Sequence, residues 1–334
     1  MRILITSKSF GRCAPEVLDF LRAKGFELTR GSKPTMTAEE IAREVPGFDA
    51  LIVGNDTIDR RVIDAGTCLK LIHMNGTGVD GIDVGYASEK GIFVANAPGA
   101  NRNAVAELAV ALMLVSARSI DRHIDLMQKG GWERRAGMEV SGKTVGILGL
   151  GNIGKRVVEL LSGFGVCVVA YDPEPDIPWA ESHRVKLAES VDEILPVVDF
   201  IVLALPYTPQ TRYILSSARI KLMKPQARII NTARGGLIDE TALCEALKAG
   251  EIGGAALDAF EAEPPPMDSP LRTAGLTLTP HMAATTVETA SSVSWIIAHN
   301  LVDILLGKNA EKALNFAAVK ARKDSGPQAE SPTH

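Results

Sequence analysis

The chain has 334 residues, of which 46% are hydrophobic and 23% charged, and its formal net charge is −4. This length favours two domains over one, and the composition is typical of globular proteins. The small negative charge, without a long basic run, argues against nucleic acid or an anionic membrane as partner, and no apolar run is long enough to span a bilayer.

The first hundred residues alternate strand-like and helical patterns, which predicts a small parallel-sheet domain. Thr37 and Glu40 have the spacing of a capping box that opens one of its helices. The expected strands are Ile3–Ser7, Phe26–Thr29, Ala50–Val53, Lys70–Met74 and Ile92–Ala95.

A long helical pattern follows, from Asn101 to about Met127, and its length suggests a connector between domains. After it, an apolar strand leads into a glycine-rich turn formed by Gly149, Gly151, Asn152, Ile153 and Gly154. The first two glycines let backbone N–H groups approach a pyrophosphate, and the third lets the next helix pack close to the strand. This arrangement predicts a dinucleotide-binding unit.

The second strand of that unit, Val166–Tyr171, delivers Asp172 at its end. A carboxylate there can accept hydrogen bonds from the ribose diol of NAD and would repel the 2′-phosphate of NADP. The following Pro173-Glu174 supplies no arginine to bind such a phosphate. The pattern therefore predicts NAD as the cofactor.

Charged residues stand where three later strands are expected to end, which is where open α/β sheets bind ligands. They are Arg234, Glu263 and His281. Each alone is also compatible with a structural role, as a salt-bridge partner, a solvated loop acid or a hydrogen-bonded histidine. Together they suit hydride chemistry on an anionic keto acid, because histidine exchanges a proton near neutral pH and arginine binds a carboxylate with two parallel bonds.

The remaining patterns complete the domain assignment. Asp239 is expected to cap a helix that Gly250 ends, and a second long helix is expected from about Thr286 to Leu306. We expect a substrate domain of residues 1–98 and 286–318, an NAD-binding domain of residues 99–285 inserted into it, and a disordered tail of residues 319–334. The fold expected is α/β, with a Rossmann-type NAD domain inserted into a flavodoxin-like substrate domain, both doubly wound parallel sheets.

These motifs resemble the D-isomer-specific 2-hydroxyacid dehydrogenase family, nearest its phosphoglycerate dehydrogenase branch. The resemblance runs from about residue 45 to residue 316. The segments that carry it are Asn75–Asp83, Ala104–Glu107, Gly149–Gly154 with Tyr171–Pro173, Asn231–Glu240, Ala256–Pro264 and Pro280–Ala283.

The resemblance implies roles for individual residues. His281 would be the acid/base, Glu263 its supporting carboxylate and Arg234 the group that binds and polarises the substrate. Asp258 would hold the nicotinamide carboxamide, and Pro206, Thr232 and Ala233 would line the cofactor. The residues implied at the substrate are Asn75, Gly76, Thr77, Gly78, Val79, Asn101, Arg134 and Arg135.

Two features concern the substrate. Phosphoglycerate dehydrogenases usually place basic residues just after the strand ending at Val53 and just before Gly76, whereas this chain has Gly54 and Met74-Asn75 there. Arg134 and Arg135 match an arm that, in that branch, reaches into a partner subunit's site. A phosphate pocket is thus only half supported by the sequence.

The activity expected is that of an NAD-dependent D-2-hydroxyacid dehydrogenase acting on a small 2-keto or 2-hydroxy acid, with no metal. The alternatives are a glyoxylate/hydroxypyruvate reductase and, in another class, an NAD-sensing corepressor-like protein. A homodimer is expected.

The four cysteines are scattered without metal-ligand spacing, which predicts buried free thiols. Free thiols and the absence of a signal pattern at the N-terminus favour the cytoplasm.

Overall fold

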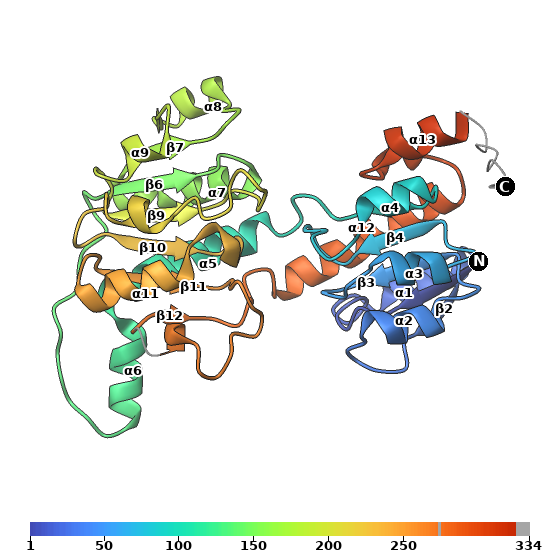
Figure 1. Ribbon diagram of the computed structural model, residues 1–334, viewed down its shortest axis with the longest axis horizontal. Coiled ribbons are helices and arrows are strands. Elements are labelled where there is room, and N and C mark those ends of the chain that lie inside the picture. The colour runs from blue at the N-terminus through green and yellow to red at the C-terminus, as the bar shows by residue number, and fades with distance from the viewer. Residues whose placement is uncertain (273–274, 325–334) are drawn as a thin grey trace, which may run out of the picture. The chain divides into compact units, whose positions relative to one another are not determined.

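The computed structural model describes residues 1–272 and 275–324, which form two compact units (Figure 1). Unit 1 contains Met1–Asn101 and the chain from Thr285 onward, and unit 2 contains Arg102–Ala284. Unit 2 is therefore inserted into unit 1. The sequence placed these divisions at residues 98/99 and 285/286, and the structure places them at 101/102 and 284/285.

Unit 1 is built on a five-stranded parallel sheet with the strand order β2-β1-β3-β4-β5. This is the order of flavodoxin-like domains. Its strands are β1 (Arg2–Ile5), β2 (Glu27–Arg30), β3 (Ala50–Val53), β4 (Leu71–Met74) and β5 (Phe93–Ala95).

Helices cover both faces of this sheet, as alternate side chains of β1 show. Ile3 and Ile5 pack with α1 and α12, whereas Leu4 packs with α2 and α3. Thr37 caps α2 with the capping box that the sequence predicted. The helices are α1 (Glu16–Ala23), α2 (Ala38–Glu44), α3 (Arg60–Ala65), α4 (Val84–Glu89), α12 (Val287–Leu305) and α13 (Phe316–Asp324), with a 3₁₀ turn η4 (Ala310–Lys312).

Unit 2 is built on a seven-stranded parallel sheet with the order β12-β11-β10-β9-β6-β7-β8. Read from β6 outward, this is the Rossmann order with one further strand, so the predicted fold class is confirmed. Its strands are β6 (Thr144–Leu148), β7 (Cys167–Tyr171), β8 (Lys186–Leu187), β9 (Phe200–Leu203), β10 (Arg228–Asn231), β11 (Gly254–Leu257) and β12 (Thr277–Leu278).

Two apolar clusters hold helices to the two faces of this sheet. One contains residues of α5 and α7, and the other residues of α9, α10 and α11. The helices are α5 (Arg102–Arg118), α6 (Ile120–Gln128), α7 (Asn152–Leu161), α8 (Ile177–Ser182), α9 (Val191–Ile194), α10 (Ser217–Ile220) and α11 (Glu240–Ala249), with 3₁₀ turns η1 (Ser162–Phe164), η2 (Gly235–Leu237) and η3 (Pro270–Arg272).

The long helix expected from Asn101 to Met127 is two helices. Ser119 adopts a left-handed backbone conformation (φ 48°), and α5 and α6 on either side of it are bent by 67°. Periodicity alone does not reveal such a break, because the apolar pattern continues through it. Among the described residues no single helix is long and apolar enough to cross a membrane, and the one bent pair that passes the same test is this one.

Two other expectations are wrong in part. Residues 319–324, expected to be disordered, form the end of α13, because Val319 is buried and Phe316 stacks on Phe93. The rest of the expected tail, 325–334, lies outside the described residues. Of the four cysteines, only Cys244 is buried, and the other three are exposed, since apolar neighbours in sequence need not be neighbours in space.

Candidate active site

The glycine-rich turn of unit 2 forms a cradle at the carboxyl end of β6. A Cβ on Gly154 would overlap the carbonyl oxygen of Gly149, so only glycine lets α7 begin this close to the strand. A Cβ on Gly151 would meet nothing within 4 Å, so the space above the turn is open. The N-terminus of α7 begins here at Asn152 and Ile153, with N–H groups and a positive dipole end suited to a pyrophosphate.

Asp172 lies beside this turn, and its role as a ribose ligand stays a prediction. One of its carboxylate oxygens accepts the N–H of Leu150 (2.7 Å), and the other accepts the N–H of Glu174 (2.9 Å). A carboxylate offers about four acceptor positions, so capacity remains on Asp172 for a ribose diol.

The other residues predicted to line the cofactor follow β9 and β10 on the same edge of the sheet. The backbone of Ala204, two residues before Pro206, lies close to Gly149. A Cβ on Gly149 would be only 2.7 Å from the Ala204 carbonyl group. The Thr232 hydroxyl is buried and has no hydrogen-bond partner within the described residues, and Ala233 is packed against the core. An open cradle, a carboxylate with free acceptor positions and a buried hydroxyl without a partner among the described residues together fit a dinucleotide.

His281 and Glu263 form a hydrogen-bonded pair at the ends of β12 and β11. Nδ1 of His281 lies 2.6 Å from Oε2 of Glu263, and the side chains are 39% and 34% exposed. The other Glu263 oxygen accepts the N–H of Phe260 (3.0 Å). With Glu263 ionised, the histidine donates through Nδ1–H. Its Nε2, which has no hydrogen-bond partner within the described residues, is then left to exchange a proton.

The loop that carries His281 is held by Asp258, which is only 1% exposed. Its Oδ1 accepts the Thr279 hydroxyl (2.6 Å) and the Met282 N–H (2.9 Å), and its Oδ2 accepts the Ala283 N–H (2.8 Å). These bonds enclose His281, whose backbone is left-handed (φ 51°) and needs such support. The structure thus shows Asp258 supporting this loop, and the predicted contact with a nicotinamide carboxamide stays a prediction.

Arg234 follows β10, in a turn organised by Asn231. The fully buried Asn231 side chain donates to the Arg234 carbonyl (2.9 Å) and accepts the Ala233 N–H (3.0 Å). A Cβ on Gly235 would overlap the backbone of Phe260, so the Arg234 turn touches the loop that carries Glu263. Unit 2 therefore brings Arg234, Glu263 and His281 to one edge of its sheet.

Glu240, at the start of α11, supports the same loop and was not assigned a role from the sequence. Its carboxylate accepts the Glu261 N–H (2.8 Å). Burial raises the pKa of Glu240, and the negative charges of Glu261 and Glu263 add to the effect.

In unit 1, the turn from Gly76 to Val79 follows β4 and is fixed by two asparagines. Asn96 donates to the Thr77 carbonyl (2.5 Å), and Asn101 donates to the Thr77 hydroxyl (3.3 Å). The role of Asn101 stays a prediction, and Asn96 was missed. Asparagine side chains that brace turns, as Asn96 and Asn231 do here, give no periodic signal; the hint in the sequence is their place, since Asn231 ends β10 and Asn96 directly follows β5.

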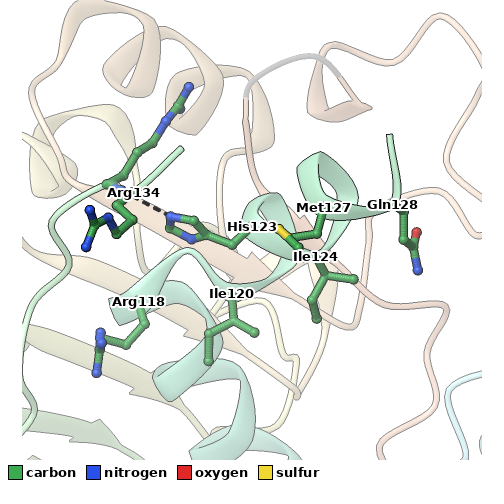
Figure 2. A pocket seen from close by; sticks show the side chains of 8 residues that line it. Arg118, Ile120, His123, Ile124, Met127, Gln128 and Arg134 are labelled. Carbon is green, nitrogen blue, oxygen red and sulfur yellow. Dashed lines mark hydrogen bonds between the residues drawn. The ribbon is translucent and has the colours of Figure 1, made fainter. Parts of the chain in front are cut away.

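Arg134 and Arg135 lie in an irregular segment beside α6 and line a cavity of about 700 Å³ with it (Figure 2). The Arg135 guanidinium pairs with the Glu133 carboxylate (2.9 Å), and the backbone N–H of Arg135 donates to Nε2 of His123 (3.2 Å). The pairing raises the pKa of Arg135 and lowers that of Glu133. The structure places both arginines next to α6 and does not test their contact with a substrate.

Comparisons with known proteins identify the family of this chain. The profile for the D-isomer specific 2-hydroxyacid dehydrogenase, NAD binding domain, matches residues 110–283, so NAD is the cofactor of unit 2. The D-3-phosphoglycerate dehydrogenase of Methanocaldococcus jannaschii is 44% identical over 86% of this chain and 56% of its own length. The hydroxypyruvate reductase of Thermotoga maritima is 42% identical over 75% of this chain and 82% of its own.

Among solved structures, the TT0316 protein of Thermus thermophilus is similar with a TM-score of 0.85 at 33% identity, covering 94% of this chain and all of that one. The chain spans little more than half the length of the phosphoglycerate dehydrogenases it matches.

Proposed function

The chain belongs to the D-isomer-specific 2-hydroxyacid dehydrogenase family, and we propose that it is an NAD-dependent dehydrogenase that interconverts a small 2-keto acid and its D-2-hydroxy acid. The observation that carries the proposal is the 2.6 Å pair of His281 and Glu263. It lies on the sheet edge that holds the dinucleotide cradle and Arg234.

His281, Glu263 and Arg234 each have a separate role in the proposed reaction. NAD, when bound, supplies or accepts a hydride. Nε2 of His281 gives a proton to the developing alkoxide in reduction and takes it back in oxidation. Glu263 fixes the tautomer and stabilises the imidazolium, and the guanidinium of Arg234 binds the substrate carboxylate and polarises the keto oxygen.

An NADH-oxidation assay with pyruvate, glyoxylate, hydroxypyruvate and 3-phosphohydroxypyruvate tests this proposal. We expect turnover of at least one acid. Tight NADH binding without turnover of any of them would instead favour a corepressor-like NAD sensor.

We also propose that the chain is a homodimer that uses α6. Within the described residues this helix buries no side chain, and it exposes Ile120, Ile124 and Met127 on one face, with Ile124 52% and Met127 53% exposed (Figure 2). An exposed apolar stripe of this kind is typical of an interface. Because Arg134 and Arg135 lie next to α6, we propose that a second copy on this helix brings them toward the partner's substrate site.

Light scattering coupled to size exclusion tests the dimer. We expect the mass of two chains for the unaltered protein and of one chain for Ile124→Glu. A monomer at micromolar concentration would contradict the dimer and the role of the two arginines at the partner's site.

The free cysteines bear on the compartment. Three of them are exposed, which favours a reducing compartment such as the cytoplasm.

A further inference from the structure

The sheet of unit 1 has a topological switch point that the catalytic residues do not use. In the order β2-β1-β3-β4-β5, the chain leaves β1 toward β2 on one side and returns to β3 on the other. Ligands of open α/β sheets bind at the carboxyl ends of strands where the order reverses in this way. Here those ends lead into Ser7 after β1, Gly54 after β3 and Asn75 after β4.

These strand ends are joined by a network of uncharged polar groups. The Asn75 side-chain amide donates to the hydroxyls of Ser7 (2.6 Å) and Ser9 (2.8 Å), and the Asn75 backbone N–H donates to the Val53 carbonyl (2.7 Å). Both amide hydrogens are thereby used. Within residues 1–272 and 275–324, the Asn75 side-chain oxygen and the two serine O–H groups have no further partner, so the network can still donate two hydrogen bonds and has acceptor positions left on all three oxygens.

The carboxylate beside this network is that of Asp56. One of its oxygens accepts the Thr6 hydroxyl (2.7 Å) and the Gly54 N–H (2.9 Å). A Cβ on Gly54 would lie 3.8 Å from the Ser7 hydroxyl oxygen and 3.9 Å from that Asp56 oxygen. Gly54 therefore faces both the neutral network and the carboxylate, with room for a side chain.

Arg30 is a cation near these strand ends, and its guanidinium is hydrogen-bonded to backbone carbonyls. Its two terminal nitrogens donate to the carbonyls of Ser7 (3.3 Å) and Phe10 (2.8 Å). Its guanidinium thus braces the backbone of the loop after β1, while Asp56 places a negative charge beside Gly54.

We propose that Ser7, Ser9 and Asn75, with Asp56, form the subsite for the end of the substrate remote from its carboxylate, and that they select a 3-hydroxy-2-keto acid over a 3-phosphorylated one. The inference rests on the proposed function and on the predicted place of the adjoining Gly76–Val79 turn at the substrate, where its backbone N–H groups would share the carboxylate with Arg234. A hydroxyl both donates and accepts, which matches the unused capacity of the network. A phosphate dianion only accepts, and the Asp56 carboxylate repels it.

The test is kcat/KM with NADH for hydroxypyruvate, pyruvate and 3-phosphohydroxypyruvate. For the unaltered chain we expect hydroxypyruvate to exceed each of the others by about tenfold or more, because sites built to hydrogen-bond a hydroxyl reject analogues that lack it. Gly54→Arg should lower the preference for hydroxypyruvate over the phosphorylated acid by about tenfold, because it adds a guanidinium that can bind phosphate.

Two further variants make the result specific. Gly54→Gln adds comparable bulk without charge, so it should not move the ratio toward the phosphorylated acid. Asp56→Asn should lower the ratio in the same direction as Gly54→Arg, which keeps the test available if the arginine variant does not fold.

The outcomes separate the two proposals. A preference of the unaltered chain for 3-phosphohydroxypyruvate overturns the subsite. In that case, loss of the preference in Arg30→Gln would identify Arg30 as the residue that binds the phosphate, and its loss in the double variant Arg134→Ala, Arg135→Ala would identify those two arginines. Equal use of pyruvate and hydroxypyruvate also overturns it. No turnover of any keto acid overturns the proposed function itself.

Discussion

The two units each carry a histidine near the carboxyl end of a parallel strand, in opposite surroundings. His281, after β12, is 39% exposed and bound to a carboxylate. His73, in β4, is fully buried; its Nδ1 lies 2.9 Å from the Met74 carbonyl and its Nε2 lies 3.0 Å from the Asn300 amide. With Nδ1–H donated to the carbonyl, both nitrogens of His73 are satisfied by neutral partners.

The difference between these histidines shows what makes one of them reactive. Burial without a carboxylate lowers the pKa of His73 to about 4, so it stays neutral near neutral pH and joins β4 to α12. His281 has a carboxylate on one nitrogen and an unoccupied second nitrogen. The partner and the exposure, rather than the strand-end position, therefore distinguish a proton-transfer group from a structural one.

The largest expected effect is at His281. His281→Ala should lower kcat by about 10²–10⁴-fold, the usual range for an acid–base group, and should leave NADH affinity nearly unchanged. Steady-state kinetics and NADH fluorescence titration measure the two quantities. His183→Ala, on the exposed end of α8, is the matched control and should retain kcat; turnover of His281→Ala close to the unaltered rate would remove the acid/base assignment.

The buried histidine should instead affect stability. Its pKa is about 4 when folded and about 6.5 when unfolded, so the unfolded chain binds the proton more readily and unit 1 loses stability as the pH falls from 6.5 to 4. The loss should total about 3 kcal/mol at pH 4 and be absent above pH 7.

Hydrogen exchange of β4 and α12 amides, corrected for intrinsic rates, measures this loss at pH 7 and pH 5. His73→Gln should flatten the pH dependence, whereas His281→Ala should not. An unchanged slope in His73→Gln would assign the pH dependence to other groups.

Asp258 distinguishes the two histidines further, because it holds the loop of His281 and makes no hydrogen bond to the surroundings of His73 among the described residues. Replacing it by asparagine should weaken charge-assisted bonds worth about 1.5–3 kcal/mol each, misplace His281 and lower kcat about tenfold or more. Thr279→Val removes one of the bonds and should have a smaller effect. If Asp258 acts on the nicotinamide instead, its loss will raise KM for NADH while kcat is retained.

The smallest expected effect is on cofactor choice. Asp172→Ala should narrow the ratio of kcat/KM for NADH over NADPH, because the repulsion of the 2′-phosphate is lost. Asp176→Ala, a carboxylate in the same region that is paired with Lys155 (2.6 Å), is the control and should leave the ratio in place. A preference of the unaltered chain for NADPH would contradict the ribose assignment.

The sequence predicted what local patterns determine. The glycine turn with Asp172, the Thr37 and Asp239 caps and both parallel sheets depend on residue type and spacing within short segments, and they are present. The burial of Val319 and the bracing of the Gly76 turn by Asn96 depend on contacts between segments that are distant in the sequence. Spacing along the chain contains no record of those contacts.

The insertion of unit 2 also sets the order in which the chain can complete its cores. One core of unit 1 joins Phe10 and Leu21 to Ile297 and Leu301 of α12, which are synthesised after all of unit 2. During translation, unit 2 can finish folding while that face of the unit 1 sheet still lacks its covering helix. A nascent chain arrested before Val287 would therefore carry a completed nucleotide-binding unit beside an exposed apolar surface, the state that chaperones recognise.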